Sequence, residues 1–132
     1  MEMTDEGLRI ELLDSSKAND IFFQIGTAKL NAKAQHLLVA IGLELGKLTN
    51  GVVVEGHTDA RPFPHGVQGY TNYELSADRA NSARRALCTG GTKDEQIKEI
   101  RGYADKKLKN LKDPYDLVNR RISIIVKYPG VK

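Results

Sequence analysis

The sequence is poor in several residue types whose absence excludes whole classes of protein. A single cysteine, Cys88, rules out a disulfide framework within the chain. No apolar run approaches the roughly 20 residues that a membrane-spanning helix needs. The first six residues are polar and acidic and do not form a signal peptide. Two interpretations stay open at this point, a cytoplasmic protein and one piece of a longer protein.

No charge of one sign dominates the chain. Lysine and arginine number 20 against 17 aspartate and glutamate, and the two signs are interspersed, which does not indicate a nucleic-acid-binding surface. The length of 132 residues and a hydrophobic content of 40% fit one globular domain. We find no repeat and no linker. The prediction is one domain over residues 1–132, with a structured core at about 7–127 and tails at 1–6 and 128–132.

Hydrophobic periodicity predicts four strands and two helices, with a brief extended piece at residues 21–23. The strands are expected at residues 7–14, 52–57, 97–103 and 120–128, where apolar residues alternate or run together. One helix is expected from Asn31, with an apolar stripe of Ala34, Leu37, Leu38, Ile41, Leu45 and Leu48. The other is expected over residues 73–89 and ends at Gly90 and Gly91. This order predicts an α/β (α+β) two-layer sandwich, a mixed sheet with helices packed on one face.

One charged residue of the second helix falls on the face that should be buried. On a helical projection Arg79 lies between Leu75 and Ala83, in the small apolar arc. A buried guanidinium without a partner costs several kcal/mol, so Arg79 needs a partner at the edge of the sheet. The nearest candidate is Asp59, which follows the strand that ends at His57.

Two hypotheses explain the pair. Asp59 and Arg79 form an ion pair that braces the loop between them, or they line a cleft and share a zwitterionic ligand. In the second case Asp59 takes an ammonium group and Arg79 takes a carboxylate through its two-pronged donor geometry. Ligands favour the carboxyl ends of strands in α/β sheets, and the loop at residues 60–72 would form a rim. We expect the two side chains to pair loosely in the empty protein and to share the ligand when it binds.

Three sequence blocks resemble a known family. They are GHTD at residues 56–59, NYELSADRANSARRAL at 72–87 and NRRISIIV at 119–126. Together they are similar to the outer-membrane protein A-like peptidoglycan-binding domain, and the likeness covers roughly residues 7–127. Within this family the similarity is greatest to the flagellar motility protein B branch, although Tyr73 stands where that branch has tryptophan.

The resemblance implies a non-catalytic anchor that binds the meso-diaminopimelate of a peptidoglycan stem peptide. It places Asp59 and Arg79 on the ligand's amphoteric end. The other implied pocket residues are Thr58, Asn72 and Leu75, with Gly26, Thr27, Arg84, Arg85 and Arg121 as weaker candidates. For the three arginines a solvated charge or a structural ion pair is an equal alternative.

The resemblance also implies a cellular setting. The chain would be the periplasmic domain of a single-pass inner-membrane protein of the flagellar stator, form a homodimer, and meet motility protein A through a transmembrane part absent from this sequence. It implies no cofactor and no metal.

Other functions are open to the same residues. A lipoprotein or secretion-system anchor with this fold would use the same pocket. A hydrolase would use His57, Asp59 and Ser76, but the sequence has no Gly-x-Ser-x-Gly elbow. A metal site on His57, Asp59 and His65 lacks regular ligand spacing. A scaffold without any ligand would simply pair Asp59 with Arg79.

Overall fold

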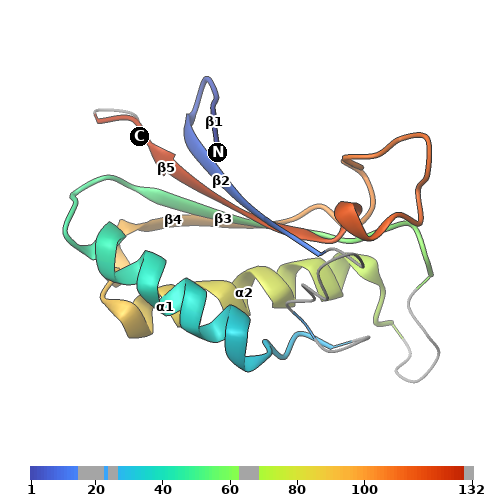
Figure 1. Cartoon of the computed structure of the whole chain (residues 1–132), viewed down its shortest axis with the longest axis horizontal. Coiled ribbons are helices and arrows are strands. Elements are labelled where there is room, and N and C mark those ends of the chain that lie inside the picture. Colours follow the sequence, from blue (N-terminus) through green and yellow to red (C-terminus); the bar gives the residue numbers. More distant parts are fainter. Residues whose placement is uncertain (15–22, 24–26, 63–68, 130–132) are drawn as a thin grey trace.

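The computed structural model describes residues 1–14, 23, 27–62 and 69–129. Two layers make up the fold, a five-stranded sheet and two helices that cover one of its faces (Figure 1). This confirms the predicted α+β sandwich and the order of its elements. The strands are β1 (Glu2–Met3), β2 (Gly7–Leu13), β3 (Val52–His57), β4 (Ile97–Gly102) and β5 (Arg121–Lys127).

The sheet is mixed and has the spatial order β1-β2-β5-β3-β4. β3 pairs with β4 in parallel, and the other neighbours are antiparallel. β2, β5 and β3 therefore have a neighbour on both sides, and all six residues of β3 are buried. The loops that follow β3 and precede β5 meet at one edge of the sheet, because His57 pairs with Arg121 across the two strands.

Both helices start at side-chain caps. α1 (Ala32–Gly46) begins where the Asn31 side chain accepts a hydrogen bond of 2.8 Å from the backbone of Ala34. α2 (Asn72–Gly90) begins at a capping box of Thr71 and Glu74. It ends at Gly91, whose φ of 135° few other residues adopt.

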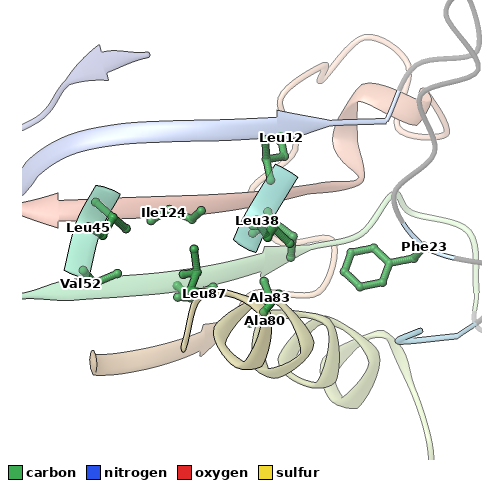
Figure 2. Close-up of a cluster of buried hydrophobic side chains, with 12 residues drawn as sticks. Leu12, Phe23, Leu38, Leu45, Val52, Ala80, Ala83, Leu87 and Ile124 are labelled. Atoms are coloured by element: carbon green, nitrogen blue, oxygen red, sulfur yellow. The ribbon is translucent and has the colours of Figure 1, made fainter. Parts of the chain in front are cut away.

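The hydrophobic core fills the space between the helices and the sheet (Figure 2). The side chain of Leu38 on α1 is 1% exposed, whereas that of its neighbour Leu37 is 40% exposed. The predicted apolar stripe was therefore too wide, since Leu37 and Leu48 face outward and Gly42 takes a buried place on α1. A close approach to α2 explains this choice: a Cβ at position 42 would lie 2.1 Å from the Leu87 carbonyl oxygen.

Two further segments, at residues 1–6 and 21–23, were predicted differently or lie partly outside the described residues. Residues 1–6 are not a tail, because β1 pairs with β2 and the Tyr128 hydroxyl donates to the Thr4 carbonyl. Of the extended piece expected at 21–23, only Phe23 lies within the described residues, and it bridges to Leu30. Among the described helices, none has the length and apolar character to cross a membrane.

Substitution of two adjacent leucines would test this assignment of the core. We expect Leu38→Ala to lower the free energy of unfolding by about 2 to 5 kcal/mol, since it leaves a cavity between α1 and the sheet. The matched change Leu37→Ala would shift it by less than about 0.5 kcal/mol. Urea unfolding followed by circular dichroism measures both. Equal losses would contradict the burial of α1 described above.

Candidate functional site

The candidate site lies where the end of β3 meets the first turns of α2. Gly56 permits this contact, since a Cβ there would lie 2.0 Å from the Ser76 carbonyl oxygen. Just beyond β3, Thr58 is fixed by its backbone N–H, which donates to the Ala104 carbonyl at 2.9 Å. Asp59 therefore emerges beside α2, at the edge of the sheet, as the sequence predicted.

The Asp59 carboxylate is 4% exposed and is held by two arginines. Its Oδ2 accepts from Arg61 Nη1 at 2.6 Å and from Arg120 Nε at 2.7 Å. Its Oδ1 accepts from the backbone N–H of Arg61 at 2.9 Å. Arg120 is the residue just before β5, so the Asp59 carboxylate links the loop after β3 to the start of β5.

Arg79 is buried as predicted, with 5% of its surface exposed. Its Nε donates to the Thr27 carbonyl at 2.9 Å, and its guanidinium carbon lies 4.9 Å from the centre of the Phe23 ring. Burial lowers the pKa of Arg79 to about 10, although the charges of Asp14 and Asp59 oppose that shift. The group is still a cation at neutral pH. Within the part of the chain that the structure describes, no side chain or carbonyl accepts from its two Nη atoms.

The expected ion pair between Asp59 and Arg79 is wrong. Among the described residues the ion-pair partners of Asp59 are Arg61 and Arg120, and Arg79 interacts with Asp59 only through longer-range electrostatics. The physical reason is reach: Arg61 and Arg120 approach the carboxylate from neighbouring loops, while the Arg79 side chain is turned towards Thr27.

The interior of this cluster holds almost no free space. The cavity between Phe23, Arg79 and Arg120 measures about 10 Å³, enough for no more than about one water molecule. A wider groove of about 320 Å³ opens at the start of α2, between Pro62 and Ala104. Asn72 lines this groove and its Nδ2 donates to the Arg61 carbonyl at 2.8 Å. Asn72 thus positions the loop that carries Arg61.

The remaining predicted residues lie in three different places. Leu75 is buried below the site, and Thr27 contributes its carbonyl to Arg79. Gly26 lies outside the described residues. Arg84 and Arg85 lie further along α2 and contact Asn81 and Ser82 rather than Asp59.

Arg120 lies at the site, whereas Arg121, a candidate from the sequence, does not. Arg121 extends on the face opposite the helices, where its Nε donates to Glu11 Oε2 at 3.1 Å. Arg120, which the analysis missed, reaches Asp59. The alternation of side chains along a strand could have identified Arg120 from the sequence. Side chains alternate along a strand, so Arg120 shares a side with Ile122, which packs in the core, and Arg121 does not.

The open face of the sheet carries a buried polar network that includes His57. Its ring stacks on Tyr103 with centroids 5.1 Å apart, and its Nε2 lies 3.5 Å from Glu55 Oε1. Burial lowers the pKa of His57, and the Glu55 carboxylate opposes that shift. Ser76 lies on the other side of the sheet, where its Oγ donates to the Tyr73 carbonyl. The residues of the hydrolase alternative are therefore not brought together.

The metal alternative also lacks an assembled site in the part of the chain that can be described. His65 lies outside that part. Within it, no group of three or more histidine, cysteine, aspartate or glutamate side chains is placed to hold an ion.

Most of the chain is similar to a known family. Residues 22–121 match the OmpA family. The chain belongs to the OmpA family. It is 39% identical to motility protein B of Escherichia coli over 126 residues, which are 96% of this chain and 40% of that protein. The chain thus spans less than half the length of that relative.

Solved structures of the family share the fold. The periplasmic domain of Helicobacter pylori MotB superposes with a TM-score of 0.79 at 22% identity, over 98% of this chain and 81% of that one. The cell wall anchor of the T6SS from Pseudomonas aeruginosa gives a TM-score of 0.64 at 28% identity, over 80% of this chain and 74% of the other. The predicted OmpA-like fold and the similarity to motility protein B are both confirmed.

The polar network on the open face predicts a loss of stability in acid. Burial alone raises the pKa of Glu55, but contacts with His57, Arg101 and Arg9 outweigh it and lower the pKa from 4.5 to about 2. The carboxylate therefore stabilises the fold fully above about pH 4.5, by about 3 kcal/mol, and this contribution is lost as the pH falls towards 2.

Urea unfolding of Glu55→Gln at several pH values measures this contribution. We expect the variant to be less stable at neutral pH and to show a flatter dependence of stability on pH between about 4.5 and 2. The exposed change Glu95→Gln is the control and should keep the pH dependence of the wild type. A wild-type slope in Glu55→Gln would contradict the assignment.

Proposed function

We propose that this chain is a non-catalytic anchor that binds the meso-diaminopimelate end of a peptidoglycan stem peptide and holds a flagellar stator to the cell wall. One observation carries the proposal: a buried carboxylate, Asp59, lies in one cluster with the guanidinium groups of Arg79 and Arg120 at the edge of the sheet. Thr58, Asn72 and Leu75 support the loop and the helix that hold these groups.

The charges of the cluster suit a zwitterionic amino acid. Three guanidinium groups, on Arg61, Arg79 and Arg120, act with two carboxylates, on Asp59 and Asp14, so the cluster favours a ligand that brings a carboxylate. The Nη atoms of Arg79 supply paired donors of the geometry that a carboxylate accepts. Asp59 is the group that an ammonium would meet. Diaminopimelate ends in an amine and a carboxylate on one carbon and satisfies both.

Arg61 takes the place of the ligand's ammonium in the empty protein. Its Nη1 lies 2.6 Å from Asp59 Oδ2, and its side chain is the most exposed of those that contact that carboxylate. Since Asp59 is buried and its Oδ2 already accepts from Arg61, an ammonium that binds this oxygen must displace Arg61. The guanidinium already stacks over Tyr115, 5.2 Å from its ring centre, which provides a place for it after displacement.

The comparisons favour a stator over other wall anchors. The relative named motility protein B matches at 39% identity across 96% of the chain. The T6SS cell wall anchor matches at 28% across 80%. A secretion-system or lipoprotein anchor is the second candidate and would use the same cluster. In the stator, the chain is the periplasmic part of an inner-membrane protein, acts as a homodimer and works beside motility protein A.

Binding of one stem peptide by such a site is weak. The contact is small, and the charged groups of both partners lose water when they meet. Two linked copies on one cell wall raise the effective affinity without any new contact. A homodimer is therefore the form in which this site would hold against the force of a motor.

Co-sedimentation with diaminopimelate-type peptidoglycan tests the proposal. Wild-type protein should pellet with the wall, whereas Asp59→Asn and Arg79→Gln should lose more than about tenfold in affinity, because the first removes the partner of the ligand's ammonium and the second removes the partner of its carboxylate. Asp94→Asn on the far surface and Arg84→Gln on the same helix are matched controls. Circular dichroism confirms that each variant is folded.

Two results would contradict the proposal. Equal pelleting of wild type and both folded site variants would show that the wall binds elsewhere. Failure of the dimeric protein to pellet at all would leave Asp59 and its arginines as a structural brace.

Removal of Arg61 should strengthen binding. We expect Arg61→Ala to bind free meso-diaminopimelate about two- to fivefold more tightly, because the ligand's ammonium no longer competes with a partly exposed ion pair. Calorimetric titration measures the affinity, with Lys112→Ala as an exposed control. Weaker binding by Arg61→Ala would show that Arg61 contacts the ligand instead of blocking it.

A further inference from the structure

A second, larger groove lies beside α2 and is not used by the proposed site. It measures about 870 Å³ and separates residues 27–35 from the later turns of α2. Figure 1 shows the stretch that leads into α1 passing beside that helix. The polar residues that line it include Lys29, Asn31, Gln35, Ser82, Arg85 and Thr89.

The charge of this groove is positive and uncompensated. Lys29 and Arg85 are both exposed, and none of the described lining residues is acidic. Within the described chain neither cation forms an ion pair, and the side chain of Arg85 donates only to Ser82 Oγ, at 3.0 Å. Two neighbouring cations without a carboxylate suit an anionic ligand, and the hydroxyl and amide groups around them suit a polar backbone.

The groove meets the cluster around Arg79 at Thr27. Thr27 contributes to both the groove and the cluster, because it lines the groove and its carbonyl accepts from Arg79 Nε. Ser82 follows Arg79 by one helical turn and fastens the wall of the groove through a 2.6 Å hydrogen bond to the Ala28 carbonyl. Arg85 follows by one more turn, roughly 9 Å along the axis from Arg79, a distance that two or three residues of an extended peptide span.

We propose that this groove binds the continuation of the stem peptide, with a free carboxylate of that peptide on Arg85 and Lys29. The proposal rests on the function proposed above, since it assumes diaminopimelate at Asp59 and Arg79. In diaminopimelate-type stems the neighbouring residue is a glutamate that is linked through its side chain and keeps a free α-carboxylate. That carboxylate lies one residue from the diaminopimelate, within the span that separates Arg79 from Arg85. The groove therefore distinguishes a stem peptide from free diaminopimelate.

Calorimetric titration with three probes tests the proposal. The probes are free meso-diaminopimelate, a sugar-free stem peptide of alanine, glutamate and diaminopimelate, and the glycan disaccharide without peptide. We expect Arg85→Gln and Lys29→Gln each to weaken binding of the stem peptide about two- to fivefold, and to leave binding of free diaminopimelate unchanged. Arg84→Gln is the matched control, because Arg84 is the neighbour of Arg85 on α2, carries the same charge and lies outside the groove.

Amidation of the glutamate carboxylate supplies an independent arm. The amidated stem peptide should bind wild type as weakly as the unmodified peptide binds Arg85→Gln, and Arg85→Gln should no longer distinguish the two peptides.

Several outcomes would overturn the proposal. They are equal effects of Arg85→Gln and Arg84→Gln, a loss that is as large with free diaminopimelate, and a loss confined to the disaccharide, which would assign the groove to sugar. Each leaves the function of Asp59 and Arg79 intact if wild type binds diaminopimelate and Asp59→Asn does not. Absence of any binding by wild type would overturn both proposals together.

Discussion

The contact between α2 and the end of β3 is the constraint on which the site depends. Gly56 allows the helix backbone to approach the strand closely enough that a side chain at this position would overlap the Ser76 carbonyl. The approach buries Arg79 beside the sheet edge and brings Asp59 out of the adjacent turn. Two opposite charges removed from water need partners, and the loops at that edge supply them. Local packing of a glycine thus leads to a cluster of charged groups.

The two faces of the sheet bury different kinds of side chain. Towards the helices, β3 and β5 contribute valine and isoleucine to an apolar core. On the opposite face Glu55 is buried against Arg9, Arg101 and His57, and Glu11 accepts from Arg121. Charges on that face stabilise the sheet without a second layer of helices. This separates arginines with a structural partner from Arg61, Arg79 and Arg120, which surround the candidate ligand site.

Prediction from the sequence succeeded where a residue's environment follows from its neighbours along the chain. The burial of Arg79 could be inferred because the apolar arc of a helix repeats every few residues, and the edge position of Asp59 because it follows a buried strand. Leu37 was misplaced because the width of a buried stripe depends on how closely a second helix approaches. Arg120 was missed in favour of Arg121, although strand alternation separates them, because the buried face of β5 was not extended back beyond its first residue.

The sequence by itself determined the two helices, the four longer strands, their order and the family, since these depend on periodicity, caps and short motifs. Only the tertiary structure decided which charges meet. In the folded protein Asp59 pairs with Arg61 and Arg120, and Arg79 donates to the Thr27 carbonyl. The tertiary structure also opened a cationic groove between segments more than fifty residues apart. The reason is that a long charged side chain can reach any of several partners within a few ångströms. The packing of loops and helices decides which of these partners lie within its reach.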